Sequence, residues 1–183
     1  MKNEPATSDA SPDASPDASS FVQAAVARHQ APLLRYATRL LHGDVERARD
    51  VVQDTFVRLM AQPPEQVFDH VAEWLFTVCR NRAHDVLRKE GRMSRFAEGQ
   101  AERITASEPR PGITLERAEQ QAAVLKLIGQ LPHNQQEVVR LKFQNGFSYQ
   151  EISRITSLSV GNVGFILHHA LKTLRQNLAA QPE

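Results

Sequence analysis

We predict an all-α fold of two small helical domains joined by a flexible linker. Apolar side chains recur at steps of three or four residues through 21–91 and again through 117–178, the spacing of one face of a helix. Between these stretches, residues 92–116 hold few apolar side chains and are broken by Pro109 and Pro111. A length of 183 residues suits two small domains better than one large core.

Two tails complete the predicted domain division. Residues 1–20 repeat Ser-Pro-Asp-Ala and carry almost no apolar side chains, so they cannot bury enough surface to offset the entropy lost on ordering. We interpret them as a disordered acidic tail. Residues 179–183 form a short tail after the second domain.

Composition narrows the function classes. The 22 Lys and Arg residues nearly balance 21 Asp and Glu residues, so a nucleic-acid surface must be a local patch. Cys79 is the sole cysteine, which excludes an internal disulfide and suits a reducing compartment. No stretch approaches the roughly 18 apolar residues of a membrane span, and the first residues lack a secretory signal. We therefore expect a cytoplasmic protein without membrane insertion.

The first domain is predicted to contain four helices. Proline suits the first turn of a helix, so we place the start of a second helix at Pro32, after one that ends near Gln30. A third helix follows Asp44, and its apolar positions run from Ala48 to Met60. Pro63-Pro64 stops it, and a loop then leads to a fourth helix from about Phe68 to Glu90.

The fourth predicted helix has an unusually basic side. Arg80, His84 and Arg88 lie four residues apart on one line, and the stretch 80–95 carries six Lys and Arg residues against two acidic ones. Charges on a helix usually mark only a solvated face. The local bias in a nearly neutral protein, together with nearby aromatic residues such as Phe76, favours nucleic-acid binding instead.

Two helices are expected to open the second domain. One begins near Arg117 and ends at Leu131-Pro132, with Val124 among its inward positions. Asn134 can cap the next, which places Phe143 inward before Asn145-Gly146 stops it.

The second domain ends in a helix-turn-helix pattern. Ser148 lies three residues before Glu151, the spacing of a capping box. The first helix places Ile152 and Ile155 on one face, and a break follows at residues 156–158. Ser159 can cap a further helix to about Leu178. The apolar stripe of this second helix is Val163, Leu167, Leu171, Leu174 and Leu178. Two helices joined by so short a turn form the unit whose second helix enters a DNA major groove, although an ordinary helical hairpin would share the pattern.

Several motifs then occur in one order along the chain. The first domain contains Asp50-Val51-Val52-Gln53-Asp54-Thr55-Phe56, and later Trp74-Leu75 followed by Cys79-Arg80-Asn81-Arg82. The second domain contains Leu131-Pro132, Gln136-Glu137-Val138 and Phe147-Ser148-Tyr149-Gln150-Glu151-Ile152. Together these motifs resemble a bacterial RNA polymerase sigma factor of the extracytoplasmic-function (ECF) group, and the likeness covers about residues 21–178.

The resemblance implies a specificity subunit with no catalysis and no cofactor of its own. Its expected partners are core RNA polymerase, promoter DNA and an anti-sigma factor or other regulator. The residues implied for polymerase binding are Asp50, Gln53, Asp54 and Arg58. Those implied for the minus-ten element are Gln66, Phe68, Asp69, His70, Arg80, Asn81, His84, Arg88 and Lys89. Those implied for the minus-thirty-five element are Ser148, Tyr149, Arg154, Ser159, Gly161, Asn162, Phe165, His168, His169 and Lys172.

The chain departs from the family pattern at two places. Arg47-Ala48-Arg49-Asp50 stands where the family commonly has Asp-Ala-Glu-Asp, which predicts weaker polymerase docking or another kind of control. Residues 164–169 stand where relatives usually carry Lys and Arg, which predicts a modest and more apolar affinity for the minus-thirty-five element. Asn162 is then the candidate for an adenine contact and Phe165 for a thymine methyl group.

Two other function classes stay open at this point. A stand-alone helix-turn-helix regulator would use its first domain to sense a ligand or to dimerise. A helical adaptor that binds only protein would explain the charge-poor recognition helix. An enzyme is the least favoured class, because the sequence shows no Gly-rich phosphate loop, no nucleophile–base pattern and no metal-ligand spacing around His168 and His169.

Overall fold

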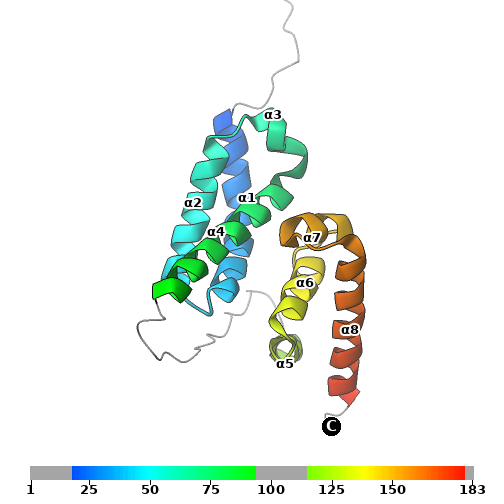
Figure 1. The fold of residues 1–183 in the computed structure, drawn as a ribbon. Coiled ribbons are helices and arrows are strands. Elements are labelled where there is room, and N and C mark those ends of the chain that lie inside the picture. The colour runs from blue at the N-terminus through cyan, green and yellow to red at the C-terminus, as the bar shows by residue number, and fades with distance from the viewer. Residues whose placement is uncertain (1–17, 94–114, 180–183) are drawn as a thin grey trace, which may run out of the picture.

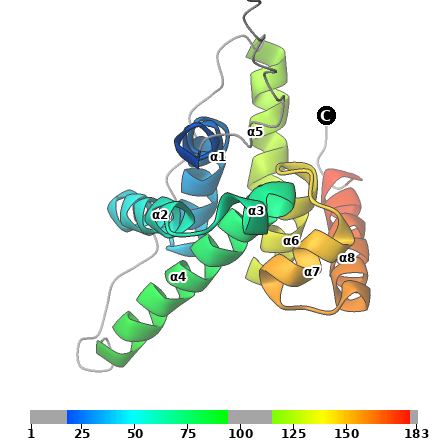
Figure 2. The same cartoon turned by 90° about the horizontal axis from the view of Figure 1, so that it is seen from above.

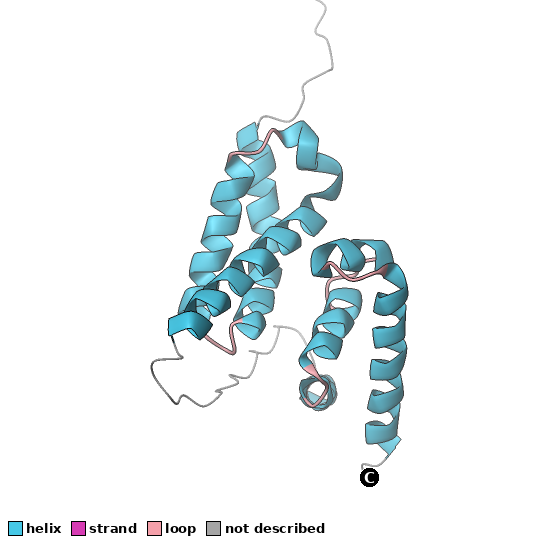
Figure 3. Cartoon of the chain, viewed as in Figure 1, coloured by secondary structure: helices cyan, strands magenta, loops and turns pink. Residues whose placement is uncertain are grey.

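The computed structural model describes residues 18–93 and 115–179, and every element within these ranges is helical, as predicted (Figures 1 and 3). Most of the expected acidic tail and linker lies outside the described residues. The elements are α1 (Ala18–Leu40), α2 (Val45–Met60), α3 (Pro64–Val67), the 3₁₀ turn η1 (Phe68–His70), α4 (Val71–Met93), α5 (Leu115–Gly129), α6 (His133–Phe143), α7 (Tyr149–Thr156) and α8 (Val160–Ala179).

The first helix corrects one prediction, because α1 is a single helix of 23 residues that runs through Pro32. Proline removes one backbone donor and normally costs a helix about 3 kcal/mol. Here the buried face continues across it at steps of three and four residues, and its burial outweighs that local cost. The buried residues of α1 are Phe21, Ala25, His29, Leu33, Tyr36 and Ala37.

Helices α1, α2 and α4 pack side by side and form the first domain's core (Figures 1 and 2). Helix α2 begins directly after Asp44, as predicted, and the Asp44 side chain caps it by accepting a hydrogen bond from the backbone N–H of Arg47 at 3.0 Å. Leu59 is buried near the end of α2, whereas Met60 is 68% exposed, contrary to the prediction. Met60 is the last residue of α2, and its exposure shows that no neighbouring helix covers its side chain there.

The segment before α4 is also more helical than predicted. Pro63 occupies the cap position and Pro64 begins α3, where the missing N–H of proline costs nothing because first-turn donors have no partner in the helix. The segment expected to be a loop before the fourth helix therefore forms α3 and η1, and α4 begins at Val71 rather than near Phe68.

Helices α5 to α8 form the second group, with α6 and α7 beside α8 (Figures 1 and 2). Helix α6 begins at His133 with Pro132 at the cap, so Asn134 is not the cap, and its Oδ1 instead accepts from the N–H of Gln135 at 2.9 Å. Phe143 is 60% exposed, because α6 ends there.

Two further predicted inward positions are wrong. Val124 lies on the exposed side of α5, where Leu127 and Ile128 are the buried residues. Leu178 is exposed near the end of α8, beyond the part of that helix that packs on α6 and α7. No helix in the described ranges combines the length and the apolar character that crossing a membrane requires.

Candidate nucleic-acid interface

The helix-turn-helix of α7 and α8 is stabilised at its start by the predicted capping box. The Oγ of Ser148 accepts from the N–H of Glu151 at 3.2 Å, and the carboxylate of Glu151 accepts from the N–H of Ser148 at 2.7 Å. The hydrogen bonds to Ser148 lower the pKa of Glu151, because they favour the ionised carboxylate. Two backbone N–H donors at the start of α7 are therefore satisfied locally.

The turn between α7 and α8 depends on three serine residues. Ser157 adopts a left-handed backbone with φ 59°, which reverses the chain direction after α7. Ser153 Oγ donates to the carbonyl of Leu158 at 2.5 Å, and Ser159 Oγ accepts from the N–H of Asn162 at 3.2 Å. The hydroxyl groups thus fix the turn at both helix ends.

The inner faces of α7 and α8 form a closed apolar contact. Ile152 and Ile155 of α7, and Val163 and Leu167 of α8, are all almost fully buried. Because these residues recur at steps of three and four, both helices keep an outer face in solvent, although α7 also packs against α4. Every residue predicted for the minus-thirty-five element is exposed there: Ser148, Tyr149, Arg154, Ser159, Gly161, Asn162, Phe165, His168, His169 and Lys172.

The exposed face of α8 carries aromatic and amide groups rather than a row of charges. Phe165 is 63% exposed, and its ring centroid lies 4.2 Å from that of His169. The ring of Tyr149 lies beside Gly164, where an added Cβ would be 3.7 Å from it. Lys142, which the sequence reasoning missed, places its ammonium group 5.4 Å from the centroid of Tyr149. Its position at the end of α6 carried no motif.

The residues predicted for the minus-ten element lie in two places. Gln66, Phe68, Asp69 and His70 are exposed on α3 and η1, and the ring of Phe68 lies 5.7 Å from that of Phe21. Four more form an exposed surface along α4: Asn81, His84, Arg88 and Lys89. Both groups are open to solvent.

The side of α4 that bears Arg88 is less strongly basic than its sequence indicates. Arg88 donates to the carboxylate of Asp85 at 2.7 Å, and Arg82 pairs with Asp54 of α2 at 2.5 Å. His84 has a lowered pKa, chiefly because partial burial disfavours the imidazolium and also because Arg80 is close. His84 therefore contributes little positive charge at neutral pH.

Arg80 differs from its neighbours, because it points into the contact between the two helical groups. Its Nε donates to Oε1 of Glu137 at 2.8 Å, and its Nη2 donates to Oε2 at 3.4 Å. The hydroxyl of Tyr36 donates to the same Oε1 at 2.7 Å. The Arg80 side chain is 18% exposed. Burial alone would lower its pKa, but the hydrogen bond and charge of Glu137 raise the pKa further than burial lowers it.

Three aromatic rings lie beside this ion pair. The centroid of Phe76 lies 5.1 Å from that of Tyr36 and 5.0 Å from that of Phe147, which meets it edge to face. Both phenylalanine side chains are buried. Phe76, interpreted from sequence as an aromatic beside a nucleic-acid surface, is instead a packing residue between α4 and the second helical group.

A second ion pair joins the two groups. Nε of Arg154 donates to Oε1 of Glu73 at 2.7 Å, and Nη2 donates to Oε2 at 2.7 Å, so the pair is bidentate. The bond and charge of Glu73 raise the pKa of Arg154. Glu73 is buried on α4, which packs against α7. One arginine from each predicted DNA surface is thus bound to a carboxylate of the other helical group.

The predicted polymerase-binding residues lie on the outer side of α2. Asp50, Gln53 and Arg58 are exposed, and Asp54 is half-buried between Arg58 and Arg82, whose Nε atoms lie 3.0 and 2.5 Å from its Oδ2. Arg47 and Arg49, the basic residues that depart from the family pattern on this helix, both have local partners. Arg47 pairs with Asp44 at 3.1 Å, and Arg49 pairs with Glu46 at 2.5 Å.

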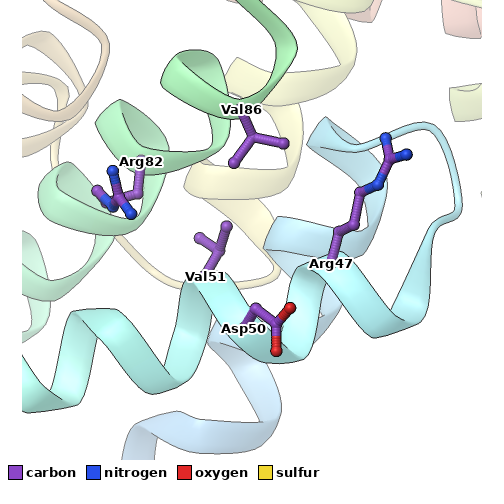
Figure 4. A pocket seen from close by; sticks show the side chains of 5 residues that line it. All are labelled: Arg47, Asp50, Val51, Arg82 and Val86. Atoms are coloured by element: carbon purple, nitrogen blue, oxygen red, sulfur yellow. The ribbon is translucent and has the colours of Figure 1, made fainter. Parts of the chain in front are cut away.

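A pocket of about 250 Å³ opens beside this surface, between α2 and α4 (Figure 4). Its lining residues are Arg47, Asp50, Val51, Arg82 and Val86. Two arginines and one aspartate make its polar rim. Among the described residues no three His, Cys, Asp or Glu side chains gather as metal ligands.

Comparison with known proteins agrees with this arrangement. Residues 25–93 match the family described as Sigma-70 region 2, and residues 121–174 match Sigma-70, region 4. The ECF RNA polymerase sigma factor SigL of Mycobacterium tuberculosis is 31% identical over 164 residues, which cover 87% of this chain and 89% of SigL. The chain belongs to the ECF RNA polymerase sigma factor family. EcfG of Rhodopseudomonas palustris, another ECF sigma factor, is 34% identical over 133 residues, covering 72% of this chain and 71% of EcfG.

Two solved structures resemble this sigma factor. CnrH in complex with the cytosolic domain of CnrY aligns with a TM-score of 0.55 and 26% identity, covering 92% of this chain and 93% of CnrH. The sigma factor RpoE in complex with the anti-sigma factor NepR from Bartonella quintana aligns with a TM-score of 0.67 at 24% identity, covering 87% and 98% of the two chains. The likeness to RpoE is one of fold.

Proposed function

We propose that this ECF sigma factor binds core RNA polymerase in the cytoplasm and directs it to promoters, with no catalytic step of its own. The first helical domain, residues 21–91, would dock on polymerase and hold the minus-ten element. The second, residues 117–178, would read the minus-thirty-five element. The observation that carries the proposal is the presence of both sigma regions in order, the second ending in a capped helix-turn-helix whose outer face is exposed.

Polymerase binding is assigned to the outer face of α2. Asp50, Gln53 and Arg58 are available to a partner, and Asp54 stays between two arginines. Arg47 and Arg49 each already pair with an acidic residue three positions earlier. Because these carboxylates partly offset the two positive charges, the arginines would weaken polymerase docking only slightly. Exposed pairs of this kind are worth about 0–1 kcal/mol.

The minus-ten element is assigned to α3, η1 and the exposed side of α4. Phosphate contacts would come from Arg88 and Lys89, and from Arg80 once it leaves Glu137. Phe68 is exposed beside this surface and offers a face on which an unpaired base can stack. The remaining assigned residues are Gln66, Asp69, His70, Asn81 and His84.

The minus-thirty-five element is assigned to the exposed face of α7 and α8. Asn162 lies in the first turn of α8, the part of a recognition helix that reaches base edges, and its amide can pair with adenine. Phe165 lies one turn later and offers an apolar contact to a thymine methyl group. Lys142 and Lys172 would supply phosphate contacts.

Transcription in vitro with core polymerase tests the proposal. Addition of the wild-type protein is expected to redirect initiation to specific promoters. Asn162→Ala is expected to lower the preference for the cognate minus-thirty-five sequence by about 1–3 kcal/mol at one base position. Gln176→Ala, which also removes an exposed amide from α8, serves as the matched control. Failure of the wild-type protein to copurify with core polymerase, together with unchanged start sites, would refute the function and favour a stand-alone regulator.

A second partner is proposed from the solved relatives. RpoE from Bartonella quintana was solved with the anti-sigma factor NepR, and CnrH with the cytosolic domain of CnrY. We propose that a regulator of this kind also binds the present chain. Copurification with an encoded binding protein that blocks transcription in vitro would support this, and full activity in its presence would contradict it.

A further inference from the structure

We propose that the two helical domains of this sigma factor form a self-inhibiting clasp, in which its own glutamates occupy the arginines that bind promoter phosphates. The clasp consists of Arg80 with Glu137 and Tyr36, and of Arg154 with Glu73. This inference rests on the proposed function for the role of the two arginines. Closure of the two domains can nevertheless be measured without DNA.

The chemistry of the two ion pairs is that of phosphate recognition. A guanidinium group presents parallel N–H donors that match either a carboxylate or a phosphate, so the two acceptors compete for one site. Arg154 donates from Nε and Nη2 to both oxygens of Glu73 at 2.7 Å, which occupies that edge of its guanidinium group. Arg80 donates to both oxygens of Glu137. While the clasp is closed, neither arginine can offer these Nε and Nη2 donors to a DNA phosphate.

The pairs are reciprocal, which makes the inhibition act on both promoter elements together. Arg80 comes from the minus-ten surface and its glutamate from α6, whereas Arg154 comes from the minus-thirty-five surface and its glutamate from α4. One opening movement therefore releases both arginines. DNA that competes for either one weakens the same interface between the two helical groups.

Aromatic packing adds to the closed state. Phe76 meets Phe147 across the contact at 5.0 Å and Tyr36 at 5.1 Å within its own domain, and both phenylalanines are buried. The Arg80–Glu137 pair lies at the same contact, and its side chains are only 18% and 13% exposed. A shielded pair is less sensitive to salt than an exposed one.

The proposed polymerase-binding face is open in the closed state. Asp50, Gln53 and Arg58 are exposed on α2 and take no part in the clasp. The closed protein can therefore dock on polymerase first and release its DNA-binding arginines afterwards. The clasp would suppress promoter binding by the free protein without blocking assembly.

A distance measurement on the full chain tests the clasp directly. Fluorophores on Gln23→Cys in α1 and Gln176→Cys in α8 report the separation of the two domains, since both positions are exposed. Cys79 is fully buried and remains unlabelled. We expect high energy transfer in the wild type and a clear loss of transfer in Glu73→Gln/Glu137→Gln. Glu65→Gln, which removes an exposed carboxylate of α3 outside the clasp, should behave as wild type.

A charge swap separates closure from DNA binding. Arg80→Glu should open the protein, and adding Glu137→Arg should restore energy transfer, because the pair is rebuilt with its charges exchanged. The swapped protein should still bind promoter DNA poorly, since residue 80 is then acidic. Far-UV circular dichroism of each variant should match the wild type, because the substituted side chains pair across the contact between the two helical groups.

Promoter binding by the free protein gives the functional readout. A protein that is mostly closed binds with its affinity reduced by the open fraction. Glu73→Gln/Glu137→Gln should therefore bind a promoter duplex roughly 10- to 100-fold more tightly than wild type, the factor expected for losing a charge-assisted hydrogen bond. Unchanged energy transfer in this variant and in Arg80→Glu would overturn the clasp. Normal opening without promoter binding, even with core polymerase, would leave the clasp standing and refute the proposed function.

Discussion

The hydroxyl of Tyr36 offers the sharpest single-atom test of how the two domains are coupled. The side chain is 5% exposed, and its oxygen donates to Oε1 of Glu137 at 2.7 Å. Tyr36→Phe keeps the ring beside Phe76 at 5.1 Å and removes only the hydrogen bond. Glu137 retains its bonds to Arg80, so no buried charge is left unpaired.

The magnitude follows from these contacts. A hydrogen bond to a charged group is worth about 1.5–3 kcal/mol. Because Glu137 keeps Arg80, we expect the lower end, about 1.5 kcal/mol, or a little more than tenfold in the closing equilibrium. Burial, and then the charge of Glu137, raise the pKa of Tyr36 well above 10.0. Because this pKa is raised, the protonated Tyr36 hydroxyl stabilises the closed state fully below pH 10, and the stabilisation is lost as pH rises above 10. In Tyr36→Phe, the closing equilibrium should lack this decrease at alkaline pH.

The assay is a double-mutant cycle of Tyr36→Phe and Glu137→Ala, in which energy transfer monitors the urea-induced separation of the domains. Alanine is used because glutamine would keep an oxygen that accepts from the Tyr36 hydroxyl. The two substitutions should be non-additive by about 1.5 kcal/mol, because they remove one shared interaction. Tyr149→Phe, which alters an exposed tyrosine outside the clasp, should be additive with Glu137→Ala. Additivity of Tyr36→Phe and Glu137→Ala within about 0.5 kcal/mol would refute the coupling.

Three further predictions concern single residues. Ser148→Ala removes one acceptor of the capping box and should lower the free energy of unfolding by about 1 kcal/mol in urea titrations. His29 has a pKa lowered from 6.5 by burial and by Arg28, so the stability of its neutral form is present above pH 6.5 and lost as pH falls below it. In His29→Gln, the melting temperature should fall less than in the wild type as pH is lowered from 7 to 5. Burial raises the pKa of Cys79 to about 12, so only on the order of one molecule in 10,000 is thiolate at pH 8, and a thiol reagent should not modify the folded protein.

Each of these predictions has a clear contrary result. Equal unfolding free energies for wild type and Ser148→Ala would show that the cap contributes nothing. An equal fall in melting temperature between pH 7 and 5 in His29→Gln would assign the loss of stability to other groups. Rapid modification of Cys79 at pH 8 would show that the core of the first domain opens readily.

The elements that sequence predicted best are those set by local chemistry. The capping box joins residues three positions apart, as does the bond between Asp44 and the N–H of Arg47. Such contacts depend on spacing that can be read directly from the sequence. The apolar stripes of α7 and α8 placed Ile152 and Leu167 correctly in the core for the same reason.

The elements that sequence mispredicted depend on tertiary burial. Pro32 indicated a helix boundary, but a continuous buried face on both sides of it kept α1 intact. Met60 and Phe143 satisfied the apolar spacing, yet each lies at a helix end where no neighbouring helix covers it. Periodicity shows which face of a helix is apolar and not how far along that face the packing extends.

The contact between the domains could not be predicted from sequence, although one signal was present. Glu73, Phe76 and Arg80 follow one another on α4 at steps of three and four, which places an acidic, an aromatic and a basic side chain on one line. A solvated helix face rarely needs a buried aromatic between its charges. Which residues would meet this line depended on the fold of a segment more than 50 positions away.

The sequence distances spanned by the interdomain pairs have a consequence for protein synthesis. Tyr36 lies 101 positions from Glu137, Arg80 lies 57 positions from it, and Glu73 lies 81 positions from Arg154. Since domains fold as units and the N-terminal one folds first on the ribosome, the helices of region 2 are complete while α6 and α7 are still untranslated. Each nascent chain therefore exposes the guanidinium of Arg80 to nearby anions for a time before its own carboxylate emerges.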